Sequence, residues 1–225
     1  MKKFLCIIFT IMILCLSACN TQPSSSANST ITNPPSTTAT SSTENSTAEA
    51  IPLQNTQLPL PNDGMEFSFL SGAGGWRSLI TLNRDGSFTG FFLDSEMGDV
   101  GEGYPNGSAY ICEFSGKFAN IEKIDEYSYK MTLAEVTTEK PIGEEWIEED
   151  IRYVASEPHG LYDSTTGQPC TEFIFYLPDT PIDQLSEEFL TWWPYRYDQD
   201  GEAKTTLSCY GILNVATNFG FFTAD

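Results

Sequence analysis

The densest set of potential metal ligands is an acidic, glycine-rich segment at residues 94–103. Four carboxylates lie there, spaced partly by glycines: Asp94, Glu96, Asp99 and Glu102. Carboxylate oxygens on a flexible segment are the ligands that Ca²⁺ prefers. The spacing departs from that of an EF-hand loop and lacks its distal bidentate glutamate. The segment therefore predicts either a weak calcium site or a solvated acidic loop, and we expect no other cofactor.

A second acidic run, at residues 144–150, places five carboxylates around Trp146 and Ile147. We expect most of this run to be a charged surface that protects a strand edge. Two converging carboxylates could act on a glycosidic bond, but the sequence selects no pair. A carbohydrate-active hydrolase is therefore an alternative prediction.

Other catalytic patterns are missing from the chain. A single histidine, His159, excludes zinc motifs that need two, and we expect it to be a loop residue at the surface. The sequence contains no G-x-S-x-G, no P-loop and no C-x-x-C motif. We therefore expect a protein that is not an enzyme.

The charge of the chain limits its partners. Its 225 residues include 31 Asp and Glu against 11 Lys and Arg, which gives a formal net charge of −20. Such a chain repels nucleic acid and anionic lipid head groups. We expect no nucleic-acid partner.

The N-terminus has the pattern of an export signal. Lys2 and Lys3 precede an apolar run at residues 4–16 that is too short to span a bilayer. The segment Leu16-Ser17-Ala18-Cys19 resembles the lipobox of bacterial lipoproteins. This resemblance implies cleavage between Ala18 and Cys19, acylation of Cys19 by chains such as palmitate, and a lipid anchor at the outer face of the cytoplasmic membrane. The alternative is an ordinary secretory signal followed by a chance cysteine.

The rest of the chain divides by composition. Residues 20–50 are rich in Ser, Thr, Asn and Pro and contain no aromatic residue, which is typical of a disordered tether. From Met65 onward aromatic residues are frequent. We therefore expect a signal peptide at 1–18, a lipidated cysteine and tether at 19–64, and one folded domain at 65–225.

Alternation of apolar and polar residues recurs through this domain and predicts strands. The expected strands are residues 65–70, 76–82, 87–93, 109–118, 127–136, 146–155, 172–177, 205–215 and 219–223. Short turns join most of them, as expected for an all-β, mainly antiparallel meander of eight or nine strands. Such a meander closes into a barrel or folds as a sandwich.

One amphipathic helix is expected late in the chain. Thr180 and Asp183 form a capping box, and Pro181 would occupy the first helical position. Apolar residues then recur at helical spacing until Pro194. We expect the helix to pack its apolar side on the mouth or face of the sheet.

Two resemblances concern the folded part. The motifs Gly72-Ala73-Gly74-Gly75-Trp76, Asp85 to Gly90, Asp94 to Asp99 and Tyr104 to Gly107 resemble a group of uncharacterised lipoproteins from clostridia-like Gram-positive bacteria, over most of residues 65–225. That resemblance implies no known activity. The Gly-x-Trp opening of an eight-strand meander with a late helix is similar to lipocalin-like, or calycin, barrels.

The aromatic residues of the expected barrel suggest a function. If the barrel holds a cavity, its lining would include Trp76, Phe88, Phe92, Tyr110 and Phe114, and otherwise these side chains form the core. The sequence thus predicts a membrane-anchored lipoprotein that binds a small apolar or amphipathic ligand or an envelope component. The alternative is a protein-interaction or envelope-assembly module, with an exposed aromatic patch at Trp192, Trp193, Tyr195 and Tyr197.

Three cysteines fall in the expected domain: Cys112, Cys170 and Cys209. An extracytoplasmic location permits a disulfide between any two of them. The sequence does not choose among the three pairings.

Overall fold

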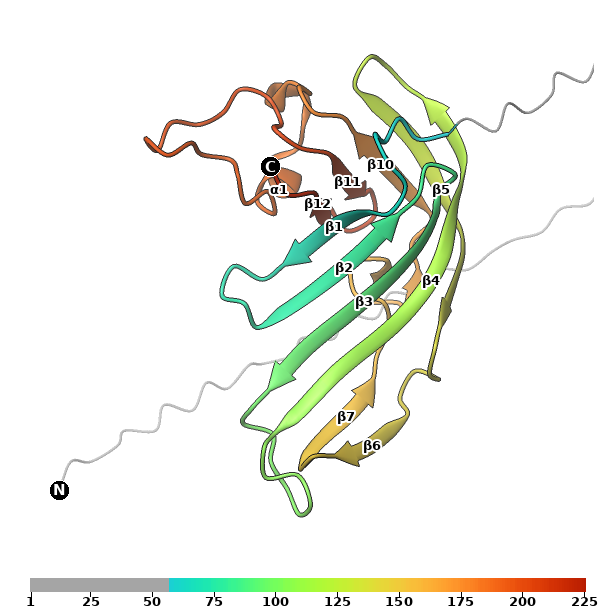
Figure 1. The fold of residues 1–225 in the computed structure, drawn as a ribbon, viewed down its shortest axis with the longest axis vertical. Coiled ribbons are helices and arrows are strands. Elements are labelled where there is room, and N and C mark those ends of the chain that lie inside the picture. The colour runs from blue at the N-terminus through green and yellow to red at the C-terminus, as the bar shows by residue number, and fades with distance from the viewer. Residues whose placement is uncertain (1–56) are drawn as a thin grey trace, which may run out of the picture. The chain divides into compact units, whose positions relative to one another are not determined.

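Eight antiparallel strands close into a barrel in chain order (Figure 1). The computed structural model describes residues 57–225, so Ala18, Cys19 and most of the expected tether lie outside the described residues. The barrel strands are β1 (Met65–Leu70), β2 (Trp76–Leu82), β3 (Ser87–Glu96), β4 (Ser108–Lys123), β5 (Ser128–Thr138), β10 (Glu172–Tyr176), β11 (Gly211–Asn214) and β12 (Gly220–Phe222). The predicted all-β antiparallel meander is confirmed, and it forms a barrel rather than a sandwich.

The barrel closes between its first and last strands. β1 pairs with β12 through a single register pair, Ser68 opposite Phe222. The Ser68 hydroxyl also donates a hydrogen bond to the Phe222 carbonyl, at 3.3 Å. This seam is much shorter than the pairing of β3 with β4, which extends over ten residue pairs.

The remaining elements lie in two excursions from the barrel wall. They are β6 (Glu145–Glu148), β7 (Ile151–Ala155), β8 (Tyr162–Asp163), β9 (Gln168–Pro169), the 3₁₀ turn η1 (Ile182–Gln184) and the helix α1 (Glu187–Leu190). β6 and β7 form a hairpin, which replaces the single strand expected at 146–155. Glu149 and Asp150 both have positive φ, as a two-residue hairpin turn of this hand requires. β7 then pairs with the start of β4 in parallel.

The interior of the barrel is filled by side chains. Six phenylalanines there are at most 1% exposed: Phe67, Phe69, Phe118, Phe173, Phe175 and Phe221. Two cross-strand pairs fit large rings against glycines, Gly90 with Phe114 and Gly116 with Phe88. A Cβ at Gly116 would lie 2.5 Å from Phe88 Cζ. The phenylalanine rings therefore fill the space beside these two glycines, and a larger residue at either position would clash with them.

Separate segments close the two ends of the barrel. Leu58 and Leu60, next to the β2–β3 turn, are almost fully buried in the core. Leu58 and Leu60, which the expected tether included, therefore belong to the packed core. The opposite end is closed by residues 156–161, where Ser78 and Asn214 donate hydrogen bonds to the carbonyls of His159 and Gly160.

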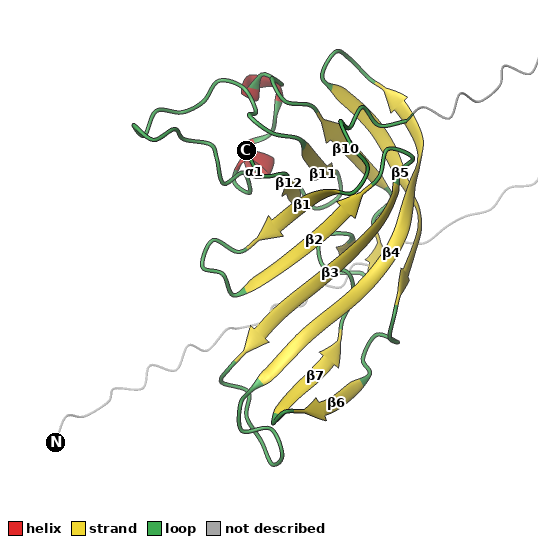
Figure 2. Cartoon of the chain, in the orientation of Figure 1, coloured by secondary structure: helices red, strands yellow, loops and turns green. Residues whose placement is uncertain are grey.

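The expected continuous helix is broken. Leu185 and Ser186 are extended, and Ser186 caps a new helical turn by accepting a hydrogen bond from the Phe189 amide. Thr180 does not form the expected capping box, because its hydroxyl donates to the Leu177 carbonyl at 2.6 Å. The expected packing is nevertheless found: Phe189 lies on the outer wall of the barrel, close to the backbone of Gly220. Its helix, α1, lies beside β11 and β12 (Figure 2).

The second excursion also shortens an expected strand. Strand residues begin only at Gly211, where 205–215 was expected. Cys209 precedes the strand and is buried in the apolar cluster beneath α1. Cys112 and Cys170 are buried in the main core. All three thiols are free, so the described part of the chain holds no disulfide.

Candidate functional site

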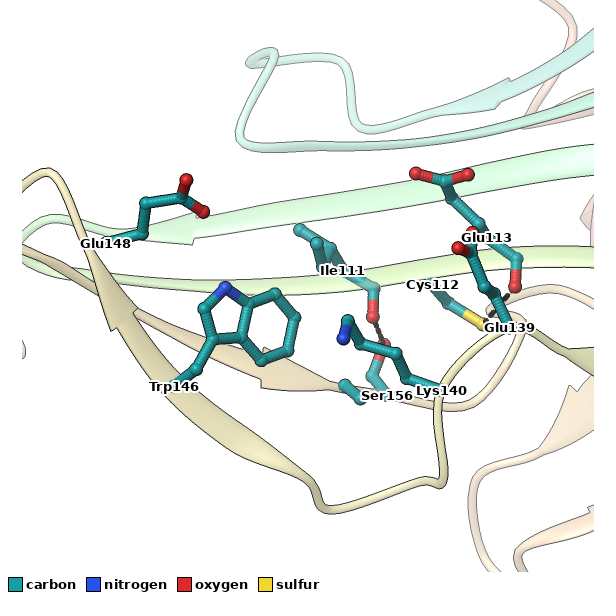
Figure 3. Close-up of a pocket in the computed structure, with 9 residues that line it drawn as sticks. Ile111, Cys112, Glu113, Glu139, Lys140, Trp146, Glu148 and Ser156 are labelled. Carbon is teal, nitrogen blue, oxygen red and sulfur yellow. Dashed lines mark hydrogen bonds between the residues drawn. The ribbon is translucent and has the colours of Figure 1, made fainter.

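A pocket of about 390 Å³ lies outside the barrel, between β4 and the β6–β7 hairpin (Figure 3). Its apolar side is formed by Ile111, Trp146 and Ala155. Its polar side includes Glu113 and Glu139, and Glu148 lies beyond Trp146. A concave site with an aromatic wall and a few polar groups is the usual form of a small-molecule site.

Strand β4 contributes to both the core and the pocket because successive side chains of a strand point to opposite faces. Cys112 and Phe114 point into the barrel and are buried. Ile111 and Glu113 point outward and line the pocket. The parallel pairing of β4 with β7 places Ala155 directly beside Ile111, which extends the apolar floor.

The hairpin fixes the position of the aromatic wall. Trp146 is paired across the hairpin with Tyr153, and their rings stack at 5.3 Å between centroids. Trp146 and Glu148 share a face of β6, as the alternation predicts. Ile147, between them in sequence, is 52% exposed and does not line the pocket.

Lys140 extends from the loop after β5 onto this wall. Its ammonium lies 4.7 Å from the centre of the Trp146 ring, a cation–π contact worth about 0.5–1 kcal/mol at an exposed site. The same ammonium lies 3.3 Å from the Glu144 carboxylate. Figure 3 shows the side chain reaching toward the indole ring. The protein thus places a cation of its own against Trp146.

Glu113 and Glu139 form a close pair of carboxyl groups. The Glu139 amide donates a hydrogen bond to the Glu113 carbonyl at 2.9 Å, which brings the two side chains together. A hydrogen bond that protonated Glu113 donates to the Glu139 carboxylate, and the negative charge of Glu139, raise the pKa of Glu113. The hydrolase alternative stays a prediction.

The Cys112 thiol borders the pocket from the core side. Burial raises the pKa of Cys112 to about 12, and the nearby Glu157 and Glu113 carboxylates act in the same direction. The group is therefore a neutral thiol near pH 7. A neutral thiol is a poor nucleophile.

The predicted ligand-lining residues belong to the core instead. Phe88, Phe92 and Phe114 are at most 7% exposed. Trp76 and Tyr110 are half-buried and pack against the same core. None of the five lines the pocket between β4 and the hairpin.

The predicted calcium ligands do not converge. Asp99 forms an ion pair with Arg152 at 2.8 Å, and the Arg152 guanidinium also stacks over Tyr104. Glu96 and Glu102 are exposed. Among residues 57–225, no group of three or more acidic, histidine or cysteine side chains is arranged to hold a metal ion.

His159 is not the surface residue that the sequence predicts. It is half-buried among aromatic rings, stacked on Phe69 at 5.4 Å and edge-on to Trp76 at 4.8 Å between ring centroids. Desolvation lowers its pKa from 6.5, against the opposing effect of Glu157 and Asp94. It packs as part of the segment 156–161, which closes this end of the barrel.

The expected aromatic patch is also absent from the surface of residues 57–225. Trp193 is 3% exposed, and Trp192 packs on the core. Of the four residues, Tyr197 alone is mostly exposed, at 59%. These rings mainly hold the second excursion against the barrel.

Sequence reasoning did not find Lys140, Glu113 or Glu139, and it noted Trp146 merely as part of an acidic run. Their proximity depends on the parallel pairing of β4 and β7, for which the sequence has no local signal. An apolar Ile111 on the outward face of β4 was the available hint.

Nothing among the described residues has the helical length and hydropathy needed to cross a membrane. Neither a family model, nor a curated protein, nor a solved structure matches the chain. The resemblances to lipoproteins and to lipocalin-like proteins therefore stay predictions.

Proposed function

We propose that this chain is a membrane-anchored extracytoplasmic lipoprotein that binds a small amphipathic ligand without transforming it. The lipobox resemblance at Cys19 supports the anchor. The pocket walled by Trp146 supports the binding role and is the observation on which this proposal depends. The ligand site lies on the outside of the barrel, in place of the interior site that the sequence suggested.

The filled interior supports this location. Eight-stranded barrels either hold one small ligand or fill with side chains, and here phenylalanine rings occupy the centre. The external pocket has a volume within the range of about 300–1,000 Å³ that ligand sites occupy. Its half-buried indole and its carboxylates suit a ligand with an apolar body and a polar head.

Native mass spectrometry of the full chain, purified from its host membranes, tests the binding role. We expect a copurified ligand on the natural chain and its loss in Trp146→Ala. Ile147→Ala is the matched control, because this neighbouring side chain does not line the pocket, and it should retain the ligand. A ligand that survives Trp146→Ala, or no ligand on the natural chain, would contradict the proposal.

The anchor has a separate test. The natural chain should enter the detergent phase of a phase-separating detergent, whereas Cys19→Ser should stay in the aqueous phase. Two or more acyl chains hold a protein at a membrane stably, which makes the difference large. Equal partitioning of the two chains would remove the anchor from the proposal.

A further inference from the structure

The Trp146 pocket is one end of a longer groove on the outer face of β2, β3 and β4. A second hollow of about 300 Å³ is lined by Thr89, Ser115 and Thr137, together with Glu113 and Glu139. A third, of about 320 Å³, is also lined by Glu113. Because all three hollows share Glu113, they adjoin one another and can hold one extended ligand.

The floor and rim of this groove differ in chemistry. Half-buried apolar side chains, Leu79 and Phe91 in the third hollow and Ile111 in the first, form the floor. Carboxylates are spread along the length: Glu66 lines the third hollow, Glu113 lines all three, and Glu148 lines the first. Such a groove suits a chain of methylene groups interrupted by positive charges.

Lys140 shows where one of these charges would sit. Among residues 57–225, it is the one cationic side chain that lines any of the three hollows. Its ammonium lies over the Trp146 ring, the favoured position for a cation on an aromatic wall. Its side chain is 46% exposed, so it can leave the ring without unfolding the chain. Lys140 therefore occupies the position that a ligand ammonium would take.

We propose that the groove binds a linear aliphatic polyamine, with one ammonium replacing Lys140 on Trp146 and others pairing with Glu113 and Glu66. This inference rests on the proposed binding role of the Trp146 pocket and names its ligand class. A neutral sugar would leave adjacent carboxylates unpaired, and an anion would be repelled by them. A bound ammonium between Glu113 and Glu139 would take the place of the proton that this pair otherwise favours.

Calorimetric titration of the full chain with spermine tests the proposal, with 1,12-dodecanediol as a neutral chain of comparable length. We expect saturable binding of spermine and none of the diol. Glu113→Gln should weaken spermine binding about tenfold, the usual loss for one hydrogen bond to a charged group. Equal binding of the diol would overturn the assignment to a polyamine.

A sharper test removes the Lys140 ammonium, which competes with a ligand ammonium for the Trp146 ring. Lys140→Met should tighten spermine binding about two- to fivefold, because an exposed cation–π contact is weak. Lys130→Met is the matched control: Lys130 also pairs with a glutamate, Glu172, at 3.3 Å and is equally exposed, but it does not line the groove. Equal tightening by both variants would show a general charge effect and contradict the role of Lys140.

The outcomes also separate this inference from the binding role itself. If spermine fails to bind while Trp146→Ala still removes a copurified ligand, the pocket binds a ligand of another class and this inference is wrong. If spermine fails to bind and no copurified ligand depends on Trp146, both proposals are wrong.

Discussion

The two faces of strand β4 have opposite roles. On the inner face, Cys112 and Phe114 are buried among aromatic rings. On the outer face, Ile111 and Glu113 line an open pocket. Successive residues of one strand thus supply the core and the candidate site. The comparison teaches that stability and binding can be changed independently here, although the residues concerned are neighbours in sequence.

The largest effect should come from a cavity on the inner face. Phe118→Ala removes a fully buried ring, which should lower the free energy of unfolding by about 3–5 kcal/mol. Phe91→Ala, on the half-buried outer face of β3, is the matched control and should cost about 1 kcal/mol. Urea unfolding measures both. Equal losses would show that the two faces do not differ as proposed.

A smaller effect should follow from overfilling the same interior. Gly116→Ala places a Cβ 2.4 Å from the Glu135 carbonyl oxygen and 2.5 Å from the Phe88 ring. Overpacking of this kind costs about 1–3 kcal/mol. Gly72→Ala meets nothing within 4 Å and should change the unfolding free energy by less than about 0.5 kcal/mol. If Gly116→Ala left the unfolding free energy unchanged, the barrel wall would be more deformable than these contacts indicate.

His159, in the segment 156–161 that closes the barrel end, should make the free energy of unfolding depend on pH, and this effect should be smaller still. Burial lowers the pKa of His159 below its ordinary 6.5, so below pH 6.5 the unfolded chain binds more protons than the folded chain. Stability from this group is complete above pH 6.5 and is lost as the pH falls through the folded pKa. His159→Phe should therefore lose less stability than the natural chain between pH 7.5 and 5.5, as measured by urea unfolding. An identical loss of stability in both chains would show that the His159 imidazole is solvated in the folded chain.

The smallest expected effect concerns the Cys112 thiol, which should not be alkylated in the folded chain. Cys112 borders the pocket, but its side chain belongs to the inner face and its pKa is about 12. Iodoacetamide at pH 8 should leave Cys112 unmodified in the folded chain and alkylate it in urea, as peptide mass spectrometry would show. Rapid alkylation of the folded chain would mean that the pocket opens through to the core.

The barrel was predictable because its strands have a simple period. Alternation located β1, β2, β5 and β10 to within about one or two residues. It does not show whether the inward side chains leave a cavity between them. Phe88 and Phe92 were therefore assigned correctly to the inner face, where they form part of the core, the second of the two roles considered for them.

The errors in the sequence prediction have local physical causes. The turn at Glu149 and Asp150 lacks the Gly or Asn that usually marks positive φ, so a hairpin was taken for one strand. Ser186 lies between two helical turns, but the apolar residues on either side of it keep helical spacing. The break in the helix was therefore not visible in the sequence pattern. Leu58 lies in a polar, proline-containing segment and becomes part of the core only through tertiary contact.

The single register pair that joins β1 to β12 also sets the order of events during synthesis. The barrel wall cannot be completed until β12, the last of its eight strands in chain order, has been synthesised. Until then the nascent chain exposes two unpaired strand edges, at β1 and β11. A truncation before β12 would leave both edges open and favour association between chains.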